Sequence, residues 1–148
     1  MKRLCPWCEQ YREFEHGVFC AKCFAKIAKR ANLDGLDRRP DLPHTLTGDS
    51  VAFTLTYWRY RCAFCDQPFA INHVRHLRAL RPTLDHIIPL KSDHCPGTVI
   101  DNIIPVCSRC NTSKYNHDVY KWLKRKFGNK KAYLKMQELH DYVRIAGF

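Results

Sequence analysis

Residues 84–114, LDHIIPLKSDHCPGTVIDNIIPVCSRCNTSK, contain two short apolar runs that predict the centre of the fold. The runs cover residues 84–88 and 103–106, and a loop with the turn dipeptide Pro96-Gly97 separates them. Two apolar runs joined by a connection with proline and glycine are typical of a β-hairpin. We therefore expect a hairpin with a long connecting loop.

Cysteine pairs with the spacing C-x2-C stand on both sides of this hairpin: Cys62 with Cys65, and Cys107 with Cys110. Two intervening residues let a tight turn present both sulfurs to one ion, and four thiolates form a tetrahedral zinc cage. Because 41 residues separate the two pairs, they must close around the hairpin. Four protein ligands leave no open position for a substrate, so we expect this zinc to be structural.

The same arrangement occurs near the N-terminus as Cys5, Cys8, Cys20 and Cys23, with eleven residues between the pairs. This spacing predicts a zinc ribbon, and so two structural zinc ions in the chain. The ninth cysteine, Cys95, is expected to be a free core thiol, with replacement of a zinc ligand as the alternative. An odd cysteine count without an apparent signal peptide argues against a disulfide framework and for a reducing compartment.

The charge of the chain predicts a polyanionic partner. The 148 residues carry a net charge of +11, and residues 51–148 hold sixteen Lys or Arg against seven Asp or Glu. Such an excess favours nucleic acid, although an acidic membrane surface or simple solubility would also account for it. No run of 18 apolar residues is present, so a transmembrane helix is not expected.

Apolar residues recur with helical spacing in four segments, residues 24–31, 50–59, 109–127 and 130–146. Asp49 or Ser50 is the expected N-cap of the second helix. Residues 33–49, rich in Gly, Pro and Asp, predict a linker or long loop. Residues 70–80 have an ambiguous pattern.

At the hairpin and its cysteines the sequence resembles the HNH endonuclease family. The resembling motifs are C-x2-C, then L-D-H-I-I-P-L, then N-I-I-P-V-C-x2-C-N-x2-K, over about residues 60–116. The resemblance implies an α+β fold, with a zinc-stabilised, treble-clef-like ββα-metal core. Many members carry Gly-Gly in the loop where this chain has Cys95-Pro96-Gly97.

The resemblance also implies roles for residues of the motifs. His86 would be the general base that removes a proton from the attacking water. Asp85 and Asn111 would bind one catalytic Mg²⁺ or Mn²⁺ through oxygen atoms, and the ion would stabilise the scissile phosphate and the leaving 3′ oxygen. Asn102 would brace the hairpin loop. Since neighbouring residues of a regular strand point to opposite sides, Asp85 and His86 require a bend in the strand.

Two residues after Asn111 have weaker assignments, both made on the assumption of one continuous helix. Lys114 lies one turn beyond Asn111, where it is a candidate phosphate contact or a solvated lysine. Asp118 would form a helix-surface ion pair, or less readily assist metal binding. Further candidate nucleic-acid contacts are basic residues in two clusters, Lys121, Lys124, Arg125, Lys126, Arg75 and Arg78. The histidines His73, His76 and His94 are surface residues by default, with phosphate binding as the alternative.

The predicted domains are a zinc module (1–32), a linker (33–49), an HNH core (50–128) and a C-terminal helix (129–148). This plan is similar to that of short HNH type II restriction enzymes such as PacI. It implies a cytoplasmic bacterial or phage enzyme that hydrolyses DNA to 5′-phosphate and 3′-hydroxyl ends, as a homodimer that cuts one strand per subunit.

Two alternatives remain open at this point. The core cysteine spacing is also similar to that of phage endonuclease VII, which implies a phage or homing-type nuclease that nicks DNA or cuts junctions. A non-catalytic zinc-finger DNA-binding protein is the second alternative. The joint presence of Asp85, His86 and Asn111 argues against it.

Overall fold

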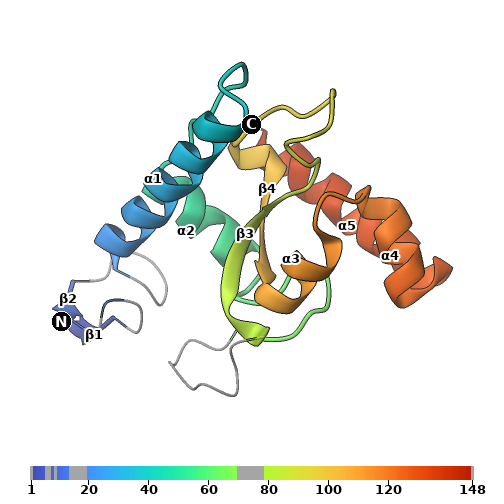
Figure 1. The fold of residues 1–148 in the computed structure, drawn as a ribbon. Coiled ribbons are helices and arrows are strands. Elements are labelled where there is room, and N and C mark those ends of the chain that lie inside the picture. Colours follow the sequence, from blue (N-terminus) through green and yellow to red (C-terminus); the bar gives the residue numbers. More distant parts are fainter. Residues whose placement is uncertain (1, 6–7, 9, 14–19, 70–78, 148) are drawn as a thin grey trace.

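The computed structural model describes residues 2–5, 8, 10–13, 20–69 and 79–147. A two-stranded sheet lies at the centre of the arrangement, with helices around it (Figure 1). Its strands are β3 (Pro82–His86) and β4 (Ile103–Cys107), which pair antiparallel as the expected hairpin. The fold is thus α+β, and no helix in the described part of the chain is long and apolar enough to cross a membrane.

The position of β4 explains its unbroken apolar sequence. All five of its residues are buried, so IIPVC shows no alternation of polar and apolar side chains. Helices α2 (Gly48–Tyr57) and α5 (Asn129–Ala146) pack near its start. The hydroxyl of the fully buried Tyr142 donates to the carbonyl oxygens of Ile100 and Ile103, at 3.0 and 2.8 Å.

The N-cap of α2 is Thr47, not Asp49 or Ser50 as expected. The Thr47 hydroxyl accepts from the backbone N–H of Ser50 at 3.1 Å, and the Ser50 hydroxyl accepts from that of Thr47 at 3.2 Å. This reciprocal capping box satisfies two backbone donors, whereas Asp49 or Ser50 alone would satisfy one.

The expectation of one helix over residues 109–127 is wrong. The structure has α3 (Ser108–Lys114) and α4 (Val119–Phe127), separated at Tyr115 by a backbone φ of 50°. Asp118 is the N-cap of α4, where its carboxylate accepts from the N–H of Lys121 at 2.9 Å. Val119, Trp122 and Leu123 of the expected helix are buried within α4, whereas Tyr115 is exposed. The break has no glycine or proline to reveal it in the sequence.

The first long helix, α1 (Ala21–Arg38), takes in residues 33–38 of the expected linker. It follows a short hairpin of β1 (Arg3–Leu4) and β2 (Tyr11–Arg12). The expected C-terminal helix forms as α5, beginning one residue early. Residues 70–78 of the ambiguous segment lie outside the described residues.

The segment after α1 is tied to the loop of the central hairpin. Thr45 N–H donates to the carbonyl of Thr98, and Thr98 N–H donates to that of Pro43, both at 3.0 Å. Gly97 permits this approach, since it has a φ of +101° and a Cβ there would lie 2.1 Å from the Pro43 oxygen. Residues outside the expected core therefore support the loop of the hairpin.

Gly35 in α1 is the clearest test of this packing. Replacing glycine by alanine inside a helix ordinarily stabilises it by about 1 kcal/mol. Here a Cβ would lie 2.2 Å from Nδ1 of His44 and 2.5 Å from Oγ1 of Thr98. We expect Gly35→Ala to lower the free energy of unfolding in urea by roughly 1–3 kcal/mol, as overpacking does. Lys29→Ala, on the exposed side of α1, is the control; a stabilised Gly35→Ala protein would contradict this packing.

Candidate functional site

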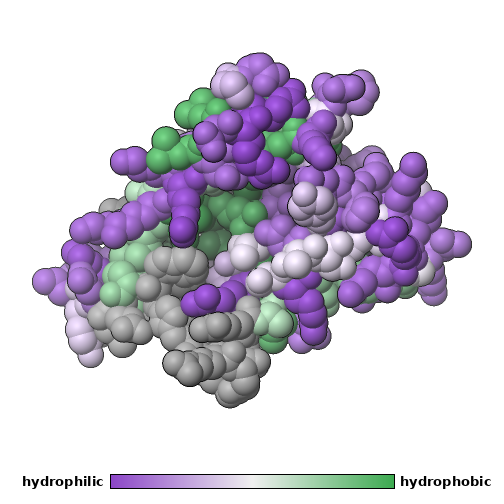
Figure 2. Space-filling view, viewed as in Figure 1, coloured by the Kyte–Doolittle hydropathy of each residue, from purple (hydrophilic) through white to green (hydrophobic). Residues whose placement is uncertain are grey.

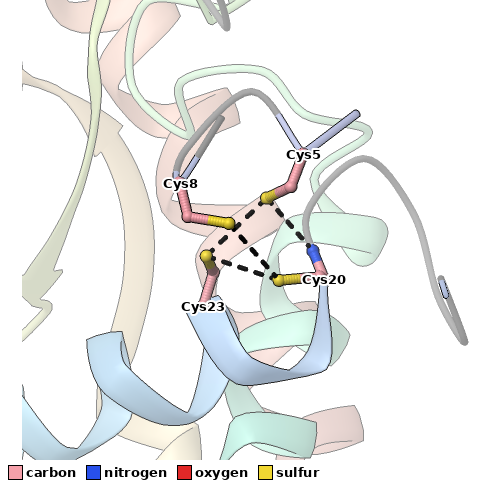
Figure 3. Close-up of side chains that lie close together, drawn as sticks. All are labelled: Cys5, Cys8, Cys20 and Cys23. Carbon is pink, nitrogen blue, oxygen red and sulfur yellow. Dashed lines mark hydrogen bonds between the residues drawn. The ribbon is translucent and has the colours of Figure 1, made fainter. Parts of the chain in front are cut away.

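The N-terminal cysteines form a four-sulfur cluster (Figure 3). Cys20 is the N-cap of α1 and Cys23 lies in its first turn, facing Cys5 and Cys8. The sulfur atoms of Cys5 and Cys23 are 3.6 Å apart, and those of Cys8 and Cys20 are 4.0 Å apart. A zinc–sulfur bond of about 2.3 Å gives a tetrahedron with edges of about 3.8 Å, whereas a disulfide requires about 2.05 Å. The cluster thus fits a zinc ion.

The cysteines around the hairpin repeat this plan. Cys62 and Cys65 lie in a tight turn, Cys107 is the N-cap of α3 and Cys110 is its third residue. The cluster is compact, with 3.9 Å between the sulfurs of Cys65 and Cys107. Thiolates are favoured at a helix N-terminus, and the Cys107 sulfur accepts from the backbone N–H of Cys110 at 3.4 Å. Two four-cysteine clusters compatible with zinc are therefore present, as expected.

Cys95 belongs to neither cluster. It is buried in the hairpin loop, where its thiol donates to the carbonyl of Ile88 at 3.3 Å. Asn102, 1% exposed, spans the same loop. Its side chain accepts from Ile88 N–H at 2.9 Å and donates to the carbonyls of Ile88 and Gly97 at 3.1 and 3.0 Å. These bonds are the ones expected of a residue that braces the loop.

Asp85, His86 and Asn111 line one cleft of about 380 Å³. Asp85 and His86 are the last two residues of β3 and both line the cleft, and the chain bends directly after them at residues 87 and 88. Asn111 follows directly after the zinc-cluster residue Cys110 in α3. The cluster therefore sets the start of the helix that presents Asn111 to the strand.

Oxygen atoms suited to a divalent cation face this cleft. Asn111 donates from Nδ2 to the Thr83 hydroxyl at 2.9 Å and more weakly to the Leu84 carbonyl at 3.5 Å, which leaves Oδ1 available as a ligand. Asp85, which is 8% exposed, also lines the cleft, and its Oδ2 is buried 3.0 Å from Nζ of Lys114. Hard cations such as Mg²⁺ take oxygen ligands of these types, so the residues present fit the expected ion.

His86 has the electrostatics of a neutral base. Burial lowers its pKa to about 4, and the positive charges of Arg38 and Lys114 act in the same direction. The imidazole is therefore unprotonated on one nitrogen at neutral pH, as a general base must be. Its Nε2 lies 3.0 Å from the hydroxyl oxygen of Thr98.

Lys114 is neither the solvated lysine nor the phosphate contact that we expected. It is fully buried, and its Nζ donates to the carbonyl of His86 at 2.9 Å and lies 3.0 Å from Oδ2 of Asp85. The distance to Asp85 is that of an ion pair, although the geometry is not that of a hydrogen bond. Burial raises the pKa of Asp85, and the Lys114 ammonium opposes that shift. Lys114 thus offsets the cost of burying the carboxylate.

Sequence reasoning missed three residues at the cleft. Arg38, at the end of α1, lines it, and His44 and Thr98 form a hydrogen-bonded pair behind His86. Arg38 and His44 lie in the expected linker, where no motif marks them.

The expected nucleic-acid contacts are only partly described by the structure. Arg75, Arg78, His73 and His76 lie outside the described residues. Lys121, Arg125 and Lys126 are exposed on α4, and Lys124 stacks over the Tyr120 ring with Nζ 4.5 Å from its centre. Hydrophilic residues cover the right-hand end of the molecule over α4 and α5 (Figure 2).

Comparison with known proteins shows what the chain is similar to. Residues 62–117 match the family model described as HNH endonuclease. Over 112 residues, the chain is 28% identical to the CRISPR-associated endonuclease Cas9 of Corynebacterium diphtheriae. Among solved structures, the Type II-C Cas9 enzyme from Actinomyces naeslundii is similar with a TM-score of 0.44 and 18% identity.

These similarities cover most of this chain but little of the other proteins. The match to the Corynebacterium protein spans 70% of this chain and 8% of that protein. The match to the Actinomyces structure spans 84% of this chain and 13% of that one. The chain thus corresponds to a small part of each.

The two clusters predict the metal content. Elemental analysis of the purified protein should give about two zinc ions per chain. Cys8→Ser and Cys65→Ser should each lose one ion, because each removes one ligand of a different cluster. Cys95→Ser should keep both; loss of an ion in this variant would show that Cys95 is a ligand.

Proposed function

We propose that this chain hydrolyses DNA phosphodiester bonds, with one divalent cation and His86 as the general base; the match of residues 62–117 to the HNH endonuclease family model supports this. The observation that carries the proposal is the meeting of Asp85, His86 and Asn111 in one cleft. A site of this kind needs a neutral imidazole beside oxygen ligands, and the buried Asp85 and the low pKa of His86 provide both.

Each residue of the cleft has a distinct task in this reaction. Asp85 and Asn111 would hold Mg²⁺ or Mn²⁺, which supplies charge stabilisation for the phosphate and the leaving 3′ oxygen. His86 accepts a proton from a water molecule, so that the oxygen of this water can attack phosphorus. Arg38 lines the same cleft with a permanent positive charge and would bind a phosphate oxygen.

We propose a type II restriction endonuclease as the biological role. Support comes from the plan of the chain, in which a separate four-cysteine module precedes a zinc-stabilised core. Because a single cleft cuts one strand at a time, we propose that a homodimer makes the double-strand cut, with one strand per subunit. A nicking or junction-cleaving nuclease is the alternative, and sequencing of the cut ends distinguishes these roles.

Substitution of the general base tests the chemistry. We expect His86→Ala to lower the rate of Mg²⁺-dependent plasmid cleavage by about 10²–10⁴-fold or more, with DNA binding and zinc content retained. His94→Ala, in the exposed hairpin loop, is the matched control. Wild-type cleavage by His86→Ala would overturn the assignment.

Substitution of the metal-binding residues tests the other half of the site. Asn111→Ala and Asp85→Ala should raise the Mg²⁺ concentration required for half-maximal cleavage, because each removes one oxygen ligand. An unchanged Mg²⁺ requirement in both variants, measured by titration of the cleavage rate, would place the ion elsewhere.

The basic end of α4 is proposed to contact DNA phosphates. Replacing Lys124, Arg125 and Lys126 with glutamine should weaken binding of all sequences alike and flatten the salt dependence by about 0.9 per lost contact on a log–log plot. The control replaces three exposed lysines of α1, Lys22, Lys26 and Lys29. Equal affinity and salt slope in the α4 variant and the wild type would place this helix off the DNA.

A further inference from the structure

A chain of hydrogen bonds runs from His86 to the backbone of the segment after α1. His86 Nε2 lies 3.0 Å from Oγ1 of Thr98, and that oxygen lies 2.7 Å from Nδ1 of His44. His44 Nε2 in turn lies 2.7 Å from the carbonyl oxygen of Arg39. All three distances are those of hydrogen bonds. Thr98 is fully buried, and His44 and Arg39 lie outside the matched residues 62–117.

The carbonyl oxygen of Arg39, at one end of this chain of hydrogen bonds, determines which nitrogen of His44 carries a proton. A carbonyl oxygen only accepts, so Nε2 of His44 must carry a proton. Nδ1 of a neutral His44 is then an acceptor. The backbone N–H of Thr98 supports this assignment, because it is shared between the Pro43 carbonyl at 3.0 Å and His44 Nδ1 at 3.3 Å. If Nδ1 of His44 carried a proton, that proton would point at the N–H of Thr98, which is itself a donor.

The same reasoning extends to His86. Since Nδ1 of His44 accepts, the Thr98 hydroxyl donates its single proton to His44. The Thr98 oxygen can then only accept from His86, so the proton of His86 lies on Nε2. Nδ1 of His86 keeps its lone pair, and no hydrogen bond to this atom occurs among the described residues.

We propose that His44 and Thr98 are positioning residues that hold the His86 proton on Nε2 and leave Nδ1 as the nitrogen that takes the proton of the attacking water. This inference rests on the proposed function, in which His86 is the base. The water proton moves to Nδ1, the water oxygen bonds to phosphorus, and the 3′ oxygen leaves with the electron pair of the broken bond and takes up a proton from solvent water. The imidazolium so formed still donates from Nε2 to Thr98.

The surrounding packing fixes this chain of bonds in place. Residues 44 and 98 pair as a parallel β-bridge, and α1 lies directly against both side chains at Gly35. The His86 ring is thus held by His44 and Thr98, which are not among the residues lining the cleft, and this support opposes a small displacement of the ring.

Removal of the Thr98 hydroxyl tests the proposal. Thr98→Val keeps the shape of the side chain but leaves Nε2–H of His86 without its acceptor. We expect kcat for cleavage to fall by about 10²-fold with little change in KM, because the base loses its orientation. Thr98→Ser, which restores the hydroxyl, should recover most of the rate. Thr54→Val removes another buried hydroxyl, which contacts Ile103 rather than His86, and should leave kcat unchanged.

Nitrogen-15 NMR of the histidine rings in the metal-free wild-type protein provides a readout that needs neither activity nor substitution. We expect the His86 proton on Nε2, exchanging slowly with water, and faster exchange in Thr98→Val. A proton on Nδ1 of His86 in the wild type, or a wild-type kcat in Thr98→Val, would overturn the inference. If His86→Ala cleaves normally, the proposed function itself fails; if only Thr98→Val cleaves normally, the function stands without this positioning role.

Discussion

The four-cysteine cluster of Cys62, Cys65, Cys107 and Cys110 is the constraint on which the site depends. It joins a tight turn to the end of β4 and the first turn of α3. Helix α3 has seven residues, too few to be stable without support from tertiary structure. Because Asn111 follows Cys110 directly, the bonds that anchor this helix also place Asn111 beside Thr83 and Leu84. The cluster thus orders the cleft although it takes no part in the proposed chemistry.

The opposite wall of the cleft is held by polar groups rather than by a metal. Asn102 spans the hairpin loop, and Lys114 pairs with Asp85 while it binds the carbonyl of His86. Burying a carboxylate is costly unless a partner charge compensates it, and removal of one member of such a pair is strongly destabilising. The groups proposed to act in catalysis are therefore kept in place by contacts that also contribute to the stability of the core.

The sequence predicts the parts of this site that depend on local patterns. Cysteine spacing predicts both clusters, because a tetrahedral zinc site requires four such ligands. The resemblance to the HNH family predicts roles for Asp85, His86 and Asn111, and the structure brings all three to one cleft. Long-range contacts were not predictable in this way. The burial of Lys114 against Asp85 and the carbonyl of His86 has no local signal in the sequence, and no glycine or proline marks the break at Tyr115. The approach of His44 to Thr98 depends on the path of a segment that reads as a linker.

The central claim is that Asp85 and Asn111 bind the catalytic cation in one cleft with His86. Anomalous diffraction from a crystal of the inactive His86→Ala protein, grown with DNA and Mn²⁺, tests it most directly. The account predicts one manganese peak in contact with oxygen atoms of Asp85, Asn111 and a DNA phosphate. A manganese peak away from both residues, or a DNA phosphate bound elsewhere on the protein, would contradict it.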